Sequence, residues 1–158
     1  MGSGKSLAAK TLEKKLKVKR LSTDELIENK EGKKIPAIFK EQGQAYFRAL
    51  EGKIVKQVAR RKGVIIDCGG GVVLNPENIK LLKKNGIIFY LKASPKVIYQ
   101  RIKKQKNRPL LDVANPQAKI TELIKKRTPL YQQADYTVDS NDADINVAVG
   151  KILQRINA

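Results

Sequence analysis

A glycine-rich segment close to the start of the sequence has the residue types that bind phosphate. Gly2-Ser3-Gly4-Lys5-Ser6 matches the second half of the pattern G-x-x-x-x-G-K-[ST]. In such a loop the backbone N–H groups wrap an oxyanion, the lysine neutralises the β and γ phosphates of a nucleotide, and the serine hydroxyl ligates Mg²⁺. A helix expected from Lys5 onward would point its positive end at the same anion. We therefore predict a nucleotide-phosphate site at residues 2–6; a flexible Gly/Ser terminus is the alternative.

This loop lacks its first part in the sequence. The first glycine of the pattern, and the apolar strand that normally carries it, would lie before Met1. A truncated chain, a start assigned too late and a fold that has lost a strand each account for this. Because that strand is usually central in the sheet of such folds, its loss should expose apolar neighbours and weaken the phosphate geometry.

Three charged residues could bind and activate an acceptor molecule. Asp24 lies at a strand-to-helix turn, which makes it the carboxylate best placed to meet a hydroxyl group. Arg48 and Arg127 are two of only eight arginines, and a guanidinium can grip a carboxylate with two hydrogen bonds. Glu51, three residues after Arg48, is expected to orient it. Each residue also has a structural alternative. Asp24 could be an aspartate favoured by the helix dipole, Arg48 a surface residue beside the core residue Phe47, and Arg127 a cation at a helix end.

Two further segments lack the periodicity of helices and strands. Gly69-Gly70-Gly71 follows a predicted strand, and three glycines exceed the needs of an ordinary turn but permit close approach of the backbone to a ligand. A tight loop is the alternative. Arg108 lies in a stretch between two helices, residues 105–116, where we expect a lid. Lids exclude water and can bring a cation onto a transferring phosphoryl group.

Helical and short-strand patterns alternate along the chain, which indicates an α/β domain with a mainly parallel sheet. Ser22 and Glu25 match a capping box, and Gly43 separates a short helical turn from a longer helix. The predicted helices cover about residues 5–16, 22–29, 35–41, 44–62, 75–86, 94–104, 115–127 and 145–156. The predicted strands cover residues 18–21, 64–66, 87–91 and 136–139.

Composition excludes several classes of protein. The 158 residues are 41% hydrophobic, which fits one globular domain that buries about two thirds of its surface. The absence of histidine excludes Ser-His-Asp triads and histidine-ligated zinc. The single cysteine, Cys68, excludes an internal disulfide and fits a reducing compartment. No apolar run approaches 18 residues, so we expect a soluble cytoplasmic monomer with no membrane partner.

The net charge of +18 raises the possibility of a nucleic-acid partner. However, the lysines are scattered in doublets on the polar sides of predicted helices, and aromatic residues make up only 5% of the chain. The chain therefore has few side chains on which bases could stack, and its sequence contains no known nucleic-acid-binding motif. We predict a solvated basic surface that favours small anionic ligands and no nucleic-acid partner, with a nucleic-acid-binding module as the alternative.

Six segments, in order, resemble motifs of the shikimate kinase family. They are the phosphate loop 2–6, Ser22-Thr23-Asp24 with residues 25–28, Ile38-Phe39 with residues 43–51, Gly69-Gly70-Gly71, Arg108-Pro109-Leu110-Leu111 and Arg127-Thr128-Pro129-Leu130-Tyr131. The resemblance covers the whole chain. It implies a three-layer α/β/α P-loop kinase with a parallel sheet, formed by residues 1–158 as a single domain with an acceptor-binding region at about 24–52 and a lid at about 105–116. It also implies Mg²⁺- and ATP-dependent phosphorylation of the 3-hydroxyl of shikimate.

The resemblance gives the candidate residues specific roles. Asp24 would bind the hydroxyl as general base, Arg48 and Arg127 would hold the shikimate carboxylate, and Gly69, Gly70 and Gly71 would contact the substrate, chiefly through Gly70. Gly2, Ser3, Gly4, Lys5 and Ser6 would bind ATP, with Mg²⁺ on Ser6. Lys5 and Arg108 would act on the ATP phosphates, and Arg101 would flank the adenine.

Two departures from the family pattern affect the expected chemistry. Ser22 replaces an aspartate that helps to hold Mg²⁺, so weaker metal binding or a lower rate is expected. Asp67, at the end of a predicted strand, is our hypothesis for partial compensation. The second departure is the acidic segment 139–144, which lacks the basic residue that some relatives have near the adenine.

Two alternatives to a shikimate kinase stay open. They are a kinase of another small hydroxy acid, such as gluconate, and an inactive relative that binds substrate without turnover.

Overall fold

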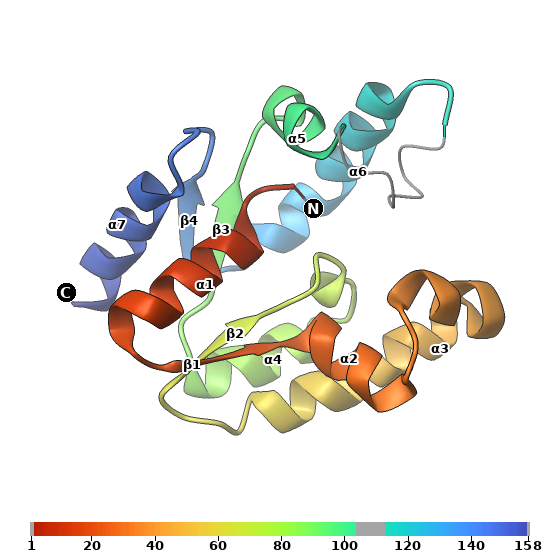
Figure 1. The fold of residues 1–158 in the computed structure, drawn as a ribbon, viewed down its shortest axis with the longest axis horizontal. Coiled ribbons are helices and arrows are strands. Elements are labelled where there is room, and N and C mark those ends of the chain that lie inside the picture. Colours follow the sequence, from red (N-terminus) through yellow and green to blue (C-terminus); the bar gives the residue numbers. More distant parts are fainter. Residues whose placement is uncertain (1, 104–112, 158) are drawn as a thin grey trace. The chain divides into compact units, whose positions relative to one another are not determined.

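The computed structural model describes residues 2–103 and 113–157 (Figure 1). The chain divides into two compact units, Leu12–Ile88 and Met1–Thr11 with Phe89–Ala158. The boundary between them falls inside helix α1 (Lys5–Leu16). Each unit contains one pair of parallel strands, β1–β2 or β3–β4, covered by helices. The parallel α/β character predicted from the sequence is thus present in both units.

The unit Leu12–Ile88 is built around strands β1 (Lys19–Ser22) and β2 (Val64–Asp67). They pair in parallel from Lys19 opposite Val64 to Ser22 opposite Asp67. Its helical elements are α2 (Thr23–Glu31), α3 (Ile35–Val58), the 3₁₀ helix η1 (Val72–Leu74) and α4 (Pro76–Asn85). The chain enters α2 directly from β1 and the glycine segment directly from β2. Because the strands are parallel, both junctions therefore lie at the same edge of the sheet.

Local sequence signals explain the ends of α2 and the shape of α3. The Ser22 hydroxyl accepts a hydrogen bond from the Glu25 amide, as the predicted cap requires, and Gly32 ends α2 with a φ of 64°. Gly43 has a φ of 81° and a ψ of 174°, so α3 consists of two helical segments joined by a kink, as predicted. α3 and α2 pack together around a core of aliphatic side chains and one phenylalanine. These residues are Ile27, Ile38, Phe47, Leu50, Ile54 and Val58.

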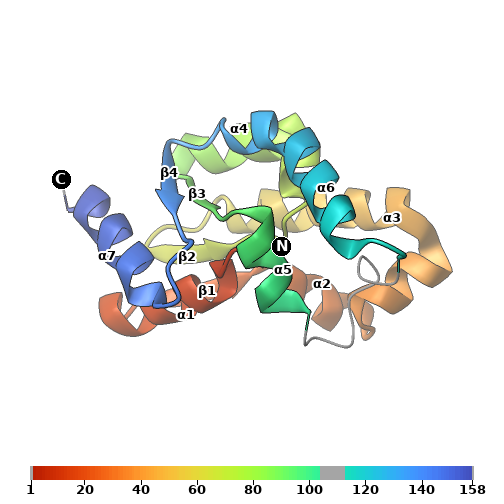
Figure 2. The same cartoon turned by 90° about the horizontal axis from the view of Figure 1, so that it is seen from above.

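The second unit contains α1 and strands β3 (Phe89–Lys92) and β4 (Tyr136–Asp139), which pair in parallel. Its other helices are α5 (Pro95–Ile102), α6 (Pro116–Tyr131) and α7 (Ile145–Ile156). α5 and α6 pack against each other, as both ribbon views show (Figures 1 and 2). Their shared core consists of Ala93, Ile98, Ile102 and Ile120.

Two helix ends differ from the prediction by more than two residues. α3 ends at Val58, before the predicted residue 62. We predicted a helix over residues 115–127, but α6 continues through Pro129 to Tyr131. Pro129 lacks an N–H group, so one intrahelical hydrogen bond is absent. The hydroxyl of Thr128 donates to the carbonyl of Ile124 at 2.7 Å, and the helix resumes its own bonding when the Gln132 amide donates to the Thr128 carbonyl. Loss of a single bond so close to the C-terminus does not end this helix.

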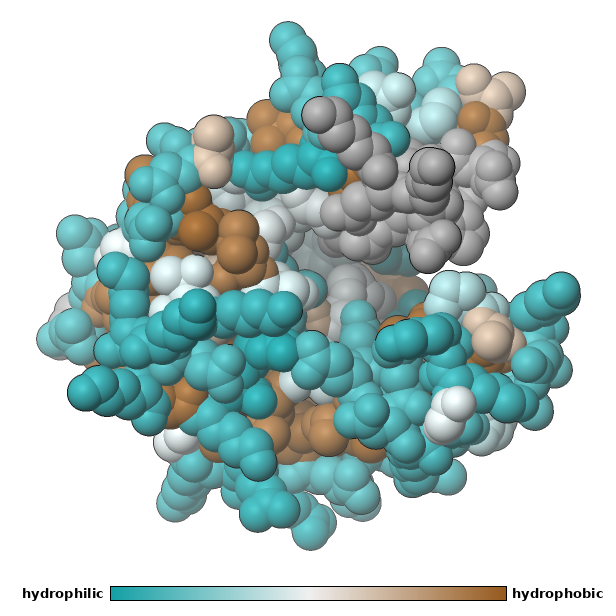
Figure 3. Space-filling view, in the orientation of Figure 1, coloured by the Kyte–Doolittle hydropathy of each residue, from teal (hydrophilic) through white to brown (hydrophobic). Residues whose placement is uncertain are grey.

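The predicted basic, hydrated surface agrees with the structure. Hydrophilic residues cover most of the face shown in Figure 3. Several cations pair with neighbouring carboxylates at the surface, as Lys119 and Lys126 do with Glu122. Within the described residues, no helix is both long and apolar enough to cross a membrane.

Candidate active site

The phosphate loop adopts a conformation that only glycine accommodates at two positions. Gly2 has a φ of 65° and Gly4 a φ of 85°, and the Gly4 carbonyl accepts the first hydrogen bond of α1 from the Ala8 amide. A Cβ atom at Gly2 would lie 2.9 Å from Cγ2 of Ile98 and of Ile102. The segment therefore packs closely on α5 and leads into the N-terminus of α1, and its binding of phosphate stays a prediction.

Ser140, which no sequence pattern indicates as a site residue, anchors this loop. Its side chain is buried, and its hydroxyl donates to the carbonyl of Ser3 at 2.9 Å and lies 3.1 Å from that of Lys92. The guanidinium of Arg101 donates to the carbonyls of Ser140 and Asp142 at 2.8 and 2.7 Å. Arg101 thus stabilises the turn after β4, and its expected contact with adenine stays a prediction. A serine within an acidic turn gives no local signal of this role, because the contact spans 137 residues.

Asp24 and the first glycine of the triple-glycine segment lie against each other in the unit Leu12–Ile88. A Cβ atom at Gly69 would lie 2.5 Å from Oδ1 of Asp24 and 3.2 Å from Oε1 of Glu51. Any side chain at Gly69 would displace these carboxylates. The glycine is therefore needed for the close approach of these two carboxylates to the backbone, and the predicted contact of the segment with a substrate stays a prediction.

Arg48 lies against the third glycine. A Cβ atom at Gly71 would collide with the Arg48 guanidinium, and Nη1 of Arg48 donates to Oε2 of Glu51 at 2.5 Å. Glu51 is only 1% exposed, and the guanidinium also lies 5.0 Å from the ring centre of Phe47. The prediction that Glu51 orients Arg48 is confirmed. Any side chain at position 71 would displace the Arg48 guanidinium.

A buried threonine and a buried asparagine, neither of them selected from the sequence, hold the glycine segment. The Thr23 hydroxyl accepts a hydrogen bond from the Gly69 amide at 2.9 Å and lies 3.5 Å from the Asp67 carbonyl. Nδ2 of Asn78, in α4, donates to the Val72 carbonyl at 3.1 Å. Thr23 lies inside the motif Ser22-Thr23-Asp24, but the hydrogen-bond partner of its hydroxyl follows only from the pairing of β1 with β2.

Arg20 forms a charged cluster beside the same junctions. Its guanidinium pairs with Asp67 at 3.1 Å and with Glu25 at 2.6 Å, and its amide donates to Glu13 at 2.8 Å. The hydrogen bond to Glu25 raises the pKa of Arg20 above its usual value, against the effect of burial. Asp67 is thus a buried partner of Arg20. Its proposed assistance to Mg²⁺ stays a prediction, tested by whether Asp67→Asn raises the Mg²⁺ concentration needed for activity.

The remaining predicted residues belong to the unit that contains the phosphate loop. Lys5 is half-buried and Ser6 is exposed in the first turn of α1, and Arg127 is half-buried in α6. Arg108 and most of the predicted lid lie outside the described residues. The structure therefore brings Asp24, Arg48 and the glycine segment together in one unit and the phosphate loop together with its supports in the other.

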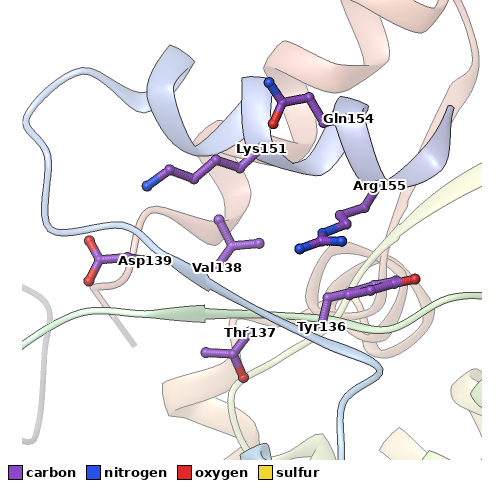
Figure 4. A pocket seen from close by; sticks show the side chains of 7 residues that line it. All are labelled: Tyr136, Thr137, Val138, Asp139, Lys151, Gln154 and Arg155. Atoms are coloured by element: carbon purple, nitrogen blue, oxygen red, sulfur yellow. The ribbon is translucent and has the colours of Figure 1, made fainter. Parts of the chain in front are cut away.

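A shallow pocket of about 530 Å³ in the same unit lies outside these clusters. It lies between β4 and α7, and Figure 4 shows Lys151 and Arg155 extending from α7 toward Asp139 and Tyr136. The Arg155 guanidinium lies 5.3 Å from the Tyr136 ring centre. No predicted site residue lines this pocket, so it does not define the active site.

The fold and the two clusters define a class of protein. Parallel α/β units, a glycine loop at the start of a helix, and an aspartate, an arginine and a glycine segment held together characterise a nucleotide-dependent kinase of small molecules. No group of three or more acidic, cysteine or histidine side chains suited to a metal occurs in the described part of the chain. A metal would thus depend on a hydroxyl such as that of Ser6 and on a ligand's own phosphates.

Comparisons with known proteins identify the family. The shikimate kinase family model matches residues 1–157. The shikimate kinases of Thermodesulfovibrio yellowstonii and of Caldanaerobacter subterraneus subsp. tengcongensis are each 43% identical over 154 residues, which is 98% of this chain and 89% and 90% of theirs. The solved shikimate kinase of Acinetobacter baumannii in complex with shikimate superposes with a TM-score of 0.93 at 37% identity, over 99% of this chain and 88% of that one.

The chain belongs to the shikimate kinase family. The resemblance seen in the six motifs is confirmed, and so is the α/β kinase fold. Enzymes of this family are ATP-dependent kinases, so the predicted class of enzyme is also confirmed.

Proposed function

We propose that the chain transfers the γ-phosphoryl group of ATP to the 3-hydroxyl of shikimate, with Mg²⁺ as cofactor. The observation that supports this most strongly is the cluster of Asp24, Arg48 and the glycine segment. A carboxylate that can accept a proton, a guanidinium that can bind a carboxylate and a glycine backbone lie within one unit, as an acid with a hydroxyl group requires. The relatives named above are shikimate kinases, which supports shikimate rather than gluconate as the acceptor.

Arg48 is suited to bind the carboxylate of the acceptor. Glu51 and the Phe47 ring fix its guanidinium, so little side-chain freedom is lost when a ligand binds. Its Nε is buried and has no hydrogen-bond partner among the described residues. Arg127 is the second arginine proposed to hold this carboxylate, and Gly70, half-buried between two buried glycines, would contact the ring.

Asp24 is proposed as the general base. Its half-buried carboxylate lies against the backbone of Gly69, so its position is defined. As the acceptor oxygen forms its bond to the γ-phosphorus and the bond to the leaving ADP oxygen breaks, Asp24 would take the hydroxyl proton. Positioning and electrostatic stabilisation together account for almost all of the catalysis in such reactions.

The phosphate loop is proposed to bind ATP. Gly2 and Gly4 have the left-handed backbone conformation found in loops whose amides bind anions, and Lys5 supplies positive charge at the start of α1. The Ser6 hydroxyl fits a hydrated Mg²⁺ as a single neutral oxygen ligand, and the metal would neutralise phosphate charge when bound. Arg108 is proposed to contact the phosphates from the lid. The family match over residues 1–157 supports one kinase domain, which we propose to be a cytoplasmic monomer.

A coupled ADP-release assay tests the proposed function. With Mg²⁺ and ATP present, ADP should form when shikimate is added but not when gluconate is added. Calorimetry in the absence of ATP should show shikimate binding. Binding of shikimate without ADP formation would indicate the inactive relative, and turnover with gluconate alone would overturn the assignment of the substrate.

A further inference from the structure

The feature that carries a further inference is the buried hydroxyl of Thr23. Thr23 is the first residue of α2, and its side chain is completely buried. The hydroxyl of a serine or threonine at the N-cap position can cap the helix, and here Ser22 performs that task by accepting from the Glu25 amide. The Thr23 hydroxyl instead accepts from the amide of Gly69, which is 46 residues away in sequence.

This hydrogen bond joins the two segments that form the proposed acceptor site. Thr23 directly precedes Asp24 at the junction of β1 and α2, and Gly69 begins the glycine segment after β2. The donor–acceptor distance is 2.9 Å, and the hydroxyl hydrogen can point toward the Asp67 carbonyl at 3.5 Å. The buried Thr23 hydroxyl therefore fixes the distance between the backbone of the β1–α2 junction, just before Asp24, and the backbone of the glycine segment.

The distance between Thr23 and Gly69 matters because Asp24 and Gly69 are already in close contact. The space for a Cβ at Gly69 is already filled, with Oδ1 of Asp24 at 2.5 Å. If the hydroxyl were absent, the Gly69 amide would be buried without its acceptor and the segment would shift to satisfy it. A shift of the segment moves the surface against which the Asp24 carboxylate rests.

We propose that Thr23 is a positioning residue for the acceptor site, which sets the Asp24 carboxylate relative to the glycine segment through its hydrogen bond to Gly69. The inference rests on the proposed function, since it assigns Asp24 and the glycines to the acceptor. Thr23 itself does not contact the reacting atoms in this account. Its hydroxyl affects shikimate turnover only through Asp24 and Gly69.

Thr23→Val tests the proposal, because valine keeps the branched shape and removes the hydroxyl. We expect kcat/KM for shikimate to fall by about 10- to 100-fold while the KM for ATP is unchanged. Thr23→Ser, which keeps the hydroxyl, should restore most of the activity. Amide hydrogen exchange should be faster at Gly69 in Thr23→Val than in the wild type.

Two control variants separate positioning from stability and from the chemical change itself. Thr121→Val removes a hydroxyl that donates to the Gln117 carbonyl on the surface of α6 and should leave all constants unchanged. Val58→Ala weakens the core of the unit Leu12–Ile88 at the end of α3 and should lower the melting temperature without raising the KM for shikimate. A purely structural role for Thr23 would give the same result as Val58→Ala.

The outcomes distinguish the inference from the function on which it rests. Turnover of shikimate by the wild type, together with wild-type kcat/KM in Thr23→Val, would overturn the positioning role alone. No turnover by the wild type would overturn the proposed function and the positioning role together. If Thr23→Val does not fold, Thr23→Ala removes the hydroxyl without crowding, and normal shikimate constants in that variant would overturn the proposal.

Discussion

The two clusters of the candidate active site are held in place by different kinds of interaction. The Asp24–Arg48 cluster is fixed by polar side chains, namely Arg20, Thr23 and Glu51, which pair with charges or with backbone groups. The phosphate loop is fixed mainly by backbone conformation, by apolar contacts with α5 and by the Ser140 hydroxyl. Removal of polar groups from the Asp24–Arg48 cluster should therefore weaken acceptor binding. Methyl groups added at Gly2 or Gly4 should weaken ATP binding.

The largest effect is expected for Asp24→Asn, which keeps the shape of the side chain and removes the base. The rate constant kcat should fall by about 10²- to 10⁴-fold because proton transfer loses its acceptor. The KM for ATP should be unchanged, since the phosphate loop is unaltered. Steady-state assays with each substrate varied will measure both constants, and Glu77→Gln, at an exposed position in α4, provides the control. A kcat within the range of the control would exclude Asp24 as the base.

Arg20→Met should cause the next largest effect, and it acts on stability. Arg20 is 9% exposed and Asp67 only 3%, so the change leaves a buried carboxylate without its cation. Removing one partner of a buried pair costs about 3–5 kcal/mol. Urea denaturation will measure the loss, and the double variant with Asp67→Asn should recover much of it. Lys33→Met breaks an exposed pair with Glu41 and should change the free energy of unfolding little. Equal losses of stability in Arg20→Met and Lys33→Met would contradict this prediction.

Two glycine variants test whether the two clusters serve different substrates. Gly71→Ala forces a methyl group into the Arg48 guanidinium and should lower kcat/KM for shikimate by about 100-fold. Gly2→Ala meets Ile98 and Ile102 and should instead raise the KM for ATP. Gly150→Ala, where a Cβ would meet nothing within 4 Å, is the matched control. If either of the first two variants altered both substrates equally, the proposed division of roles would be wrong.

The smallest effect concerns Glu28, which accepts hydrogen bonds from Lys34 and from the Ile35 amide at the start of α3. Burial raises the pKa of Glu28, but these two partners together outweigh it, so the pKa lies below its usual value. The charged form therefore stabilises the fold above the ordinary glutamate pKa, and this contribution disappears as the pH falls through the lowered value. Glu28→Gln should lose about 1 kcal/mol at pH 7, and the loss should shrink as the pH falls below the ordinary glutamate pKa. Urea denaturation over a series of acidic pH values will measure the difference between the two proteins, and a pH-independent loss would contradict the prediction.

Sequence patterns predicted most of the fold because its boundaries are set locally. Ser22, Gly32 and Gly43 act through capping and φ values that adjacent residues determine, so α2 and the kink of α3 were predicted correctly. The passage of α6 through Pro129 was missed, because tolerance of one lost hydrogen bond depends on its distance from the helix end.

The site was predictable only in part, for a related reason. Arg48 and Glu51 are three residues apart on one helix, so their contact followed from spacing. Thr23 with Gly69, and Ser140 with Ser3, meet only through the pairing of strands and the turns beyond them. Contacts of that kind require the register of the sheet, which sequence periodicity does not supply.

The most direct test of the acceptor cluster is calorimetric titration of shikimate into the wild type and into Arg48→Met. Methionine keeps an apolar side chain against Phe47 and removes the donors proposed to bind the carboxylate. We predict that the wild type binds shikimate and that Arg48→Met binds it at least about tenfold more weakly, with melting temperature as the control for folding. Equal affinity in the two folded proteins would contradict the assignment of this cluster to the acceptor.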